Sequence, residues 1–186
     1  MAKRYFLALL LVLLAVQYVT SQNMPVAPKG KALVIFTRPA MEAAILNFSY
    51  FDGEHLLSKI GSKQYVSYEC SPGKHLFWAK CENLDFLEAE LSAGEVYLVE
   101  TKVVTGMLKA RISLVAYDPT IKRADKLKNK LLERIAKRKQ VHITETTIHT
   151  KDDEAVKPDI KDGLDRYNKL KSKNKKIEVL SPDMHI

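Results

Sequence analysis

Between residues 31 and 116 the sequence is a succession of short β-prone runs separated by turn-forming residues. Turn signals such as Asp52-Gly53, Ser71-Pro72-Gly73 and Ala93-Gly94 divide it at intervals of roughly 8–12 residues. Several runs alternate apolar and polar residues, which is typical of strands with one buried face. The predicted strands cover residues 31–37, 47–51, 55–60, 64–70, 74–81, 87–91, 96–104 and 108–116. We therefore expect a mainly β fold, an antiparallel β-sandwich of about seven to eight strands.

The stretch from Tyr65 to Cys81 contains the only tryptophan and both cysteines of the chain. Its two β-prone runs flank Ser71-Pro72-Gly73, in which proline fixes φ and glycine supplies a positive φ. The stretch is either a core hairpin or an arch between two sheets. In a hairpin about this turn, Cys70 and Cys81 would lie ~20 Å apart, far beyond the reach of a disulfide. We expect no disulfide between them and two free thiols.

The first residues have the composition of a secretory signal peptide. Two basic residues precede an unbroken apolar run from Phe6 to Val16, and suitably small residues precede a cleavage point before Gln22. An uncleaved anchor is the alternative, but Gln17 ends the apolar run short of the ~20 residues that span a bilayer. We expect residues 1–21 to be removed, residues 22–30 to form a linker, and the mature chain to be exported, that is, periplasmic or secreted.

The character of the sequence changes at Asp118. From Gln22 to Tyr117 there are 10 Lys/Arg and 10 Asp/Glu, a net charge of zero, whereas residues 118–186 contain 18 and 12, a net charge of +6. Asp118-Pro119 is a helix-start signal, and Pro158 marks the start of a second predicted helix. We expect residues 31–117 to form the β-sandwich domain and residues 118–186 to form a basic extension of two α-helices.

Both predicted helices have a single apolar stripe with a 3.6-residue period. The first stripe consists of Ile121, Ala124, Leu127, Leu131 and Ile135, and the second of Ile160, Leu164, Tyr167 and Leu170. Because the first stripe has no bulky aromatic residue, it suits docking on protein better than insertion into lipid. The first helix is expected to end near Lys139. Residues 141–148 are β-prone with no predicted partner, and the basic end from Ser172 is expected to be loose.

Several short motifs follow one another in a characteristic order between residues 30 and 116. They are the strand 31–37 with its Arg38-Pro39 ending, Phe51-Asp52-Gly53, Tyr65, the segment from Ser71 to His75, and the segment from Ala93 to Tyr97. Residues 30–116 therefore resemble a DUF2846 domain, and their Asp-Gly and Pro-Gly-x-His elements also resemble PEGA-like surface domains. The resemblance implies an immunoglobulin-like β-sandwich in an exported, mostly bacterial envelope protein with no established reaction. Many relatives are lipoproteins, whereas this leader lacks a lipid-bearing cysteine.

The sequence contains no motif for catalysis, nucleotide binding or metal binding. Asp52 and His75 could be functional, but each has a structural explanation. Aspartate before glycine favours a hairpin turn, and a histidine just after a turn can hydrogen-bond to the neighbouring loop. His142 and His149 lack the companion ligands that zinc requires. We therefore predict a non-enzymatic protein with no catalytic residue, no cofactor and no metal.

Basic residues on the polar side of the first helix are the strongest candidates for a binding site. They are Lys122, Arg123, Lys126, Lys130, Arg134, Lys137 and Arg138. They can attract anionic lipid or polysaccharide, and the alternative is a solvated face above a stripe that packs on the sandwich. The export signal argues against nucleic acid as a partner.

We expect a binding or structural component of the cell envelope, whose partner is an envelope protein or a polysaccharide. The second hypothesis is a peripheral binder of anionic lipid or polysaccharide that contacts the membrane through this basic helical tail.

Overall fold

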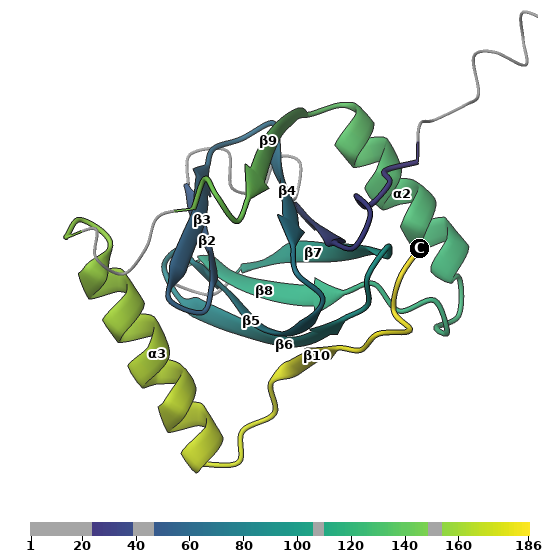
Figure 1. Ribbon diagram of the computed structural model, residues 1–186. Helices are drawn as coiled ribbons and strands as arrows, with labels where there is room; N and C mark the ends of the chain where they lie inside the picture. The colour runs from purple at the N-terminus through teal and green to yellow at the C-terminus, as the bar shows by residue number, and fades with distance from the viewer. Residues whose placement is uncertain (1–23, 39–46, 106–109, 149–153) are drawn as a thin grey trace, which may run out of the picture.

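The computed structural model describes residues 24–38, 47–105, 110–148 and 154–186 (Figure 1). These residues form ten β-strands and two α-helices, which confirms a mainly β fold. The strands are β1 (Ala32–Thr37), β2 (Phe48–Asp52), β3 (His55–Ile60), β4 (Gln64–Cys70), β5 (Gly73–Lys80), β6 (Leu84–Leu91), β7 (Val96–Thr105), β8 (Ala110–Ala116), β9 (Lys139–Thr144) and β10 (Glu178–Leu180). The helices are α2 (Ala124–Ala136) and α3 (Lys157–Ser172).

The first sheet has the strand order β8-β7-β1-β4-β9. Its central strand, β1, pairs in antiparallel register with β4, where Val34 lies opposite Tyr68, and in parallel register with β7, where Val34 lies opposite Tyr97. β9 pairs in parallel with the other edge of β4. All six residues of β1 are buried, because both faces of this sheet are covered at its centre.

The second sheet has the strand order β10-β6-β5-β2-β3. β2 and β3 form the predicted hairpin, β5 pairs with β2 and β6, and β10 joins β6 in parallel. The prediction of purely antiparallel pairing is therefore wrong for three strand pairs, β1–β7, β4–β9 and β6–β10. A parallel pair needs a long connection, and here the chain passes through the other sheet or through a helix between the paired strands.

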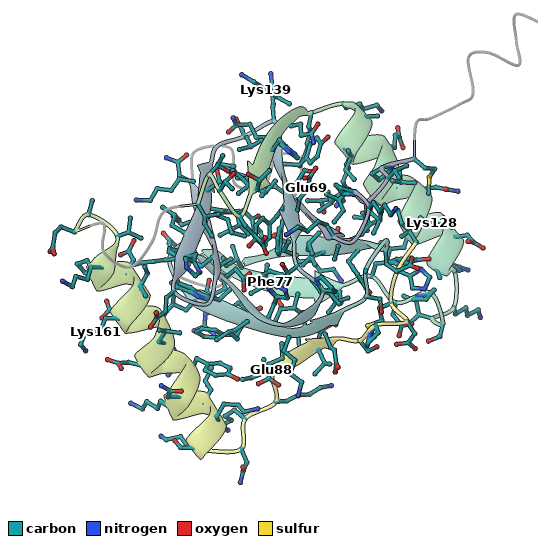
Figure 2. The ribbon with its side chains drawn as sticks, in the orientation of Figure 1. Glu69, Phe77, Glu88, Lys128, Lys139 and Lys161 are labelled. Carbon is teal, nitrogen blue, oxygen red and sulfur yellow. The ribbon has the colours of Figure 1, made fainter. Side chains whose placement is uncertain are left out.

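The inner faces of the two sheets share one hydrophobic core. Val34, Phe36, Val66 and Tyr68 enter it from the first sheet, and Phe48, Tyr50, Leu57, Phe77 and Leu87 enter it from the second. The ring of Phe36 lies edge-on to Phe77, with centroids 5.3 Å apart, and 5.2 Å from Tyr50. Phe77 is seen in the middle of the strands in Figure 2. The period-2 alternation of the strands thus places their aromatic residues between the sheets.

The stretch from Tyr65 to Cys81 is an arch between the two sheets and not a hairpin. β4 pairs with β1 in the first sheet, whereas β5 pairs with β2 and β6 in the second. Gly73 begins β5 with a φ of 117°, in the region that favours glycine. Cys70 ends β4 beside the arch, and Cys81 follows the far end of the eight-residue β5. Both cysteines are free thiols.

Helix α2 covers the outer face of the first sheet (Figure 1). Four of the five residues of its predicted stripe face the sheet, and Ile121, which precedes the helix, is exposed. The stripe contacts a cluster formed by Ala27, Leu33, Ile35, Val96, Leu98 and Tyr117. α2 begins later than predicted, because the carboxylate of Asp118 accepts the backbone N–H of Thr120, at 2.8 Å, in a local turn.

Helix α3 covers the outer face of the second sheet (Figure 1). It packs on Trp78. The indole ring is fully buried, stacks on Phe51 at 3.7 Å, and donates its N–H to the carbonyl of Gly53 at 2.9 Å. Gly163 faces the same ring from α3, and a Cβ at this position would lie 2.6 Å from Cη2 of Trp78. Glycine weakens a helix by ~1 kcal/mol relative to alanine. Here it allows the helix to approach the ring.

Residues after 118 also extend both sheets, so the described chain has ten strands rather than seven or eight. β9 forms one of the two edge strands of the first sheet, and β10 forms one of the two edge strands of the second. The end of the chain was predicted to be loose because of its basic composition, and this prediction is wrong. Leu180 is fully buried in the core, the Tyr97 hydroxyl donates to the carbonyl of Pro182 at 3.1 Å, and the Ile186 N–H donates to Val96.

The predicted signal peptide, residues 1–21, and its cleavage point before Gln22 lie outside the described residues. Neither of the described helices is long and apolar enough to cross a membrane.

Candidate functional site

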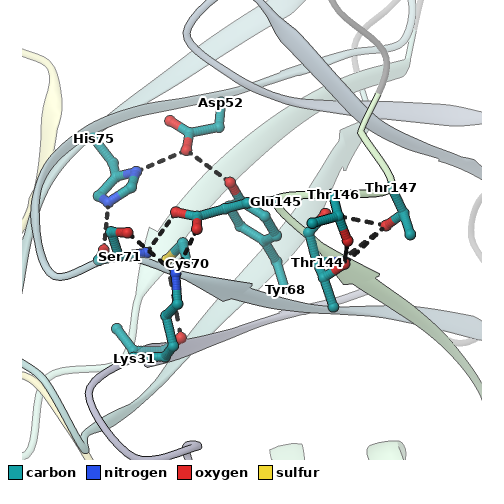
Figure 3. Close-up of polar contacts among 11 residues, drawn as sticks. Lys31, Asp52, Tyr68, Cys70, Ser71, His75, Thr144, Glu145, Thr146 and Thr147 are labelled. Atoms are coloured by element: carbon teal, nitrogen blue, oxygen red, sulfur yellow. Dashed lines mark hydrogen bonds and ion pairs between the residues drawn. The ribbon is translucent and has the colours of Figure 1, made fainter.

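Polar side chains gather where the arch leaves β4 and enters β5 (Figure 3). We define the arch cluster as Lys31, Asp52, Tyr68, Ser71, His75 and Glu145. Asp52 reaches the cluster because it is the last residue of β2, paired with His55. The turn itself uses Gly53, with a φ of 53°, and Glu54. Asp52 was predicted as a central turn residue, and the structure instead places it at the end of the strand.

His75 has an oxygen acceptor beside each ring nitrogen. Nδ1 lies 2.7 Å from Oδ2 of Asp52, and Nε2 lies 2.9 Å from the carbonyl oxygen of Ser71. Because a neutral imidazole has a single N–H, only the protonated ring donates both bonds. Burial alone lowers the pKa of His75. The hydrogen bond and charge of Asp52, with smaller contributions from Ser71 and Glu145, outweigh burial and raise this pKa above its ordinary value.

Tyr68 and Phe77 complete the surroundings of this pair. The Tyr68 hydroxyl donates to the same Asp52 oxygen at 3.3 Å, and burial followed by the charge of Asp52 raises the pKa of Tyr68. The His75 ring stacks on Phe77 with centroids 5.3 Å apart and planes within 8°. The Asp52 and His75 side chains are each 13% exposed. The pair is thus largely withdrawn from solvent, and Asp52 accepts two side-chain hydrogen bonds.

Glu145 follows β9 and attaches that edge of the first sheet to the arch. Its carboxylate accepts the Ser71 N–H at 2.8 Å and lies 2.5 Å from Nζ of Lys31. Lys31 also donates to the Ser71 hydroxyl at 3.2 Å. The hydrogen bond from Lys31, followed by that from the Ser71 backbone, lowers the pKa of Glu145 to about 2. Because both side chains of the ion pair are 38% exposed, solvent screening limits its contribution to stability.

Cys70 is the nearest nucleophilic side chain to the arch cluster in sequence. Burial raises the pKa of its thiol to about 12, so the sulfur stays protonated, and its acceptor is the Ala32 carbonyl at 4.0 Å. Throughout the described residues, no buried side-chain nitrogen or oxygen lacks a hydrogen-bond partner. Through its hydrogen bonds and its ion pair, the arch cluster connects residues at the start of β1 and the end of β9 to β2, β4 and β5.

The described ranges contain no group of three or more His, Cys, Asp or Glu side chains that could hold a metal ion. His142 lies 3.4 Å from a carboxylate oxygen of Glu69, as a two-residue contact. His149 lies outside the described residues.

Of the seven basic residues predicted to contact an anionic surface, three are held by partners within the molecule and four are not. Arg134 and Arg138 turn toward the first sheet: Arg134 lies 2.5 Å from a carboxylate oxygen of Glu100, and Arg138 donates to the carbonyl of Arg38. Lys137 is exposed but lies 2.5 Å from the carboxylate of Glu133. The other four, which we call the basic surface, are exposed and take part in none of the described ion pairs. They are Lys122, Arg123, Lys126 and Lys130.

The position of these charges is not explained by helix stability. Lys122 and Arg123 precede α2 directly and Lys126 lies in its first turn, where the helix dipole disfavours positive charge. From Lys122 to Lys139 there are nine Lys/Arg and two Asp/Glu, a net charge of +7. The positive charge of the molecule is therefore concentrated on this helix and its ends.

Residues 24–30, which we call the N-terminal segment, lie alongside α2 (Figure 1). Met24 and Pro25 line a shallow pocket with Leu132, Ile135 and Ala136 of the helix, and the buried Ala27 belongs to the cluster beneath α2. The Val26 side chain is 80% exposed. Residues 22–30 were predicted to form a linker, and their composition does not indicate a contact with α2.

A second hollow, of about 550 Å³, lies beside the end of α3 and is lined by residues that include Glu88, Tyr167 and Val179. The carboxylate of Glu88 accepts the Tyr167 hydroxyl at 2.6 Å and lies 2.7 Å from Nζ of Lys171. These partners show that Glu88 attaches α3 to β6, and Figure 2 shows it near the end of α3.

A scan against protein-family models and a search of curated proteins found no match to this chain. The resemblance to DUF2846 domains therefore rests on the sequence motifs alone.

Proposed function

We propose that this chain is an exported, non-enzymatic module that serves as a binding or structural component of the cell envelope. In this proposal the two sheets form the immunoglobulin-like sandwich implied by the DUF2846 resemblance, and the mature chain begins at about Gln22. Its partner is an envelope protein or polysaccharide. The shared core between the two five-stranded sheets supports the proposed architecture.

The observation that carries the proposal is the engagement of the arch cluster. His75, Asp52 and Tyr68 are the groups that could have formed an acid–base site, and each is bonded to another member of the cluster or to the arch backbone. A general base needs a nitrogen or oxygen that can reach a substrate proton. Here the ring nitrogens of His75 are directed at Asp52 and at the carbonyl of Ser71, as expected of a side chain whose role is to stabilise the fold.

Retention of envelope components on the immobilised mature chain, residues 22–186, tests this proposal. The expected result is saturable retention of a defined envelope protein or polysaccharide. The amount retained should fall as the concentration of soluble mature chain, added as a competitor, is raised. A chain unfolded in urea and then immobilised is the matched control for non-specific adsorption. Absence of competable retention from every envelope fraction would contradict the proposal.

The second candidate is a peripheral binder of anionic lipid or polysaccharide. It is favoured by the basic surface, whose four cations are exposed and take part in none of the described ion pairs. Three of them, Lys122, Arg123 and Lys126, lie just before or in the first turn of α2, where the helix dipole disfavours positive charge. Binding of the mature chain to envelope vesicles should then weaken steeply between ~0.05 and ~0.5 M NaCl, because salt screens exposed charges. Deletion of the tail is a poor test, since it removes β9 from the first sheet and β10 from the second. Point substitutions are needed.

A further inference from the structure

We propose that the basic surface and the N-terminal segment together form a docking surface for an anionic lipid bilayer. This inference rests on the second candidate function and names its partner. It follows from two independent features of the α2 side of the molecule: cations without ion-pair partners among the described residues, and exposed apolar side chains.

The cations are available to an external partner because the nearby acids are already paired. The two acidic residues between Lys122 and Lys139 are Asp125, which lies 3.6 Å from Lys128, and Glu133, which lies 2.5 Å from Lys137. Their partners lie outside the basic surface. The four cations of that surface span little more than two helical turns, so they can face one plane of phosphate headgroups together.

Exposed apolar side chains near both ends of α2 favour a bilayer over a polysaccharide. Among the described residues, the large hydrophobic side chains that are exposed are Met24 (45%), Val26 (80%), Ile121 (46%) and Val179. The first two lie in the segment beside α2, and Ile121 immediately precedes Lys122. A hydrated polysaccharide offers no apolar phase for these groups, whereas the interface of a bilayer accepts them and holds cations at its headgroups.

The inward face of α2 is already committed to the first sheet, which determines how the helix can meet a bilayer. Its apolar stripe packs on the cluster that contains Leu33 and Leu98, and Arg134 is paired with Glu100. The helix therefore lies on the bilayer without inserting its stripe.

The test is flotation of the mature chain, residues 22–186, with vesicles of phosphatidylcholine alone or with ~30% phosphatidylglycerol. A near-surface Lys or Arg contributes ~1 kcal/mol at an anionic bilayer, so K122Q/R123Q/K126Q/K130Q should lower the partition coefficient by roughly several hundredfold. The matched control, K169Q/K173Q/K175Q/K176Q, removes the same charge from exposed lysines at the end of α3 and beyond, and should change binding by less than about tenfold.

A second variant separates the bilayer from a soluble polymer. M24S/V26S keeps every charge and should lower vesicle partitioning by about tenfold, while retention on heparin, a soluble sulfated polysaccharide, stays unchanged. Equal partitioning of the basic-surface variant and the α3 control would overturn the inference. So would unchanged vesicle binding by M24S/V26S, which would leave an anionic polymer as the partner. The envelope-retention assay has a separate readout, so an exported module that ignores lipid would still support the primary proposal.

Discussion

Gly163→Ala tests whether α3 is docked on Trp78 as the structure describes. On an exposed helix position the added methyl would stabilise the protein by ~1 kcal/mol. At residue 163 the new Cβ would lie 2.6 Å from Cη2 of Trp78 and 2.8 Å from Cζ2 and Cζ3. The ring cannot move away cheaply, because it is fully buried and stacked at 3.7 Å on Phe51.

The expected cost combines these two effects. Overpacking of a well-packed site costs ~1–3 kcal/mol, and the gain in helix propensity offsets ~1 kcal/mol of it. We expect a net loss of up to about 2 kcal/mol in the free energy of unfolding, which lowers the urea midpoint by up to about 1 M. Trp78 is the only tryptophan of the chain, so its fluorescence reports unfolding at the perturbed site. Asn168→Ala, at an exposed position of α3, is the control and should be neutral or slightly stabilising.

A double-mutant cycle identifies the steric partner. In a Trp78→Phe background, followed by far-UV circular dichroism, Gly163→Ala should cost at least ~1 kcal/mol less than in the wild type, because the atoms in conflict are gone. A stabilising effect of Gly163→Ala in the wild-type background would refute the docking of α3 described here.

Three further predictions concern the arch and the ends of the chain. His75→Gln should lower the free energy of unfolding by about 1–3 kcal/mol near pH 5.5. This deficit should shrink as the pH rises above the ordinary histidine pKa, because a raised pKa means that the stabilisation by His75 is complete below that ordinary value and is lost through the folded-state pKa. Cys70 should resist a thiol reagent in the folded protein, since it is buried with a raised pKa, while the half-buried Cys81 reacts sooner. Deletion of residues 181–186 should cost about 1–3 kcal/mol, since Tyr97 and Val96 lose partners.

Each of these has a clear contrary outcome. A His75→Gln deficit that is the same near pH 5.5 and pH 8.5 would mean that the imidazolium does not donate to both acceptors. Labelling of Cys70 at the rate of Cys81 would mean that the end of β4 opens. Unchanged urea unfolding of the chain that ends at Leu180 would mean that the last residues do not hold the two sheets together. Mass spectrometry of labelled peptides and urea titrations measure these results.

The local elements could be predicted from the sequence because short-range signals decide them. Alternating side chains and turn residues locate β1 to β8 to within three residues at each end. The pairing of these strands could not be predicted in the same way. Whether Ser71-Pro72-Gly73 makes a hairpin or an arch depends on which sheet β5 joins, and this is decided by distant partners such as Phe51 opposite Trp78. Parallel pairs carry no turn signal that links the two strands.

The candidate site was predicted in part. Periodicity identified the basic side of the first helix, but it could not separate Arg134 and Arg138, which turn inward, from the four exposed cations. The burial of Arg134 depends on Glu100 in β7, a contact between residues far apart in sequence. The contact of Met24 and Pro25 with α2 also escaped prediction, because an extended segment has no period that shows which element it contacts.

The fluorescence of Trp78 in vesicles that contain dibrominated phosphatidylglycerol tests the central functional claim most directly. Trp78 lies beneath α3, on the outer face of the second sheet, whereas the proposed docking surface is on α2, over the first sheet. For protein that floats with the vesicles, we predict unquenched Trp78 emission in the wild type. Ile121→Trp adds a second tryptophan beside the basic surface and should produce an additional emission that the bromines quench. Quenching of Trp78 in the bound wild-type protein, or no quenching in Ile121→Trp, would contradict the account.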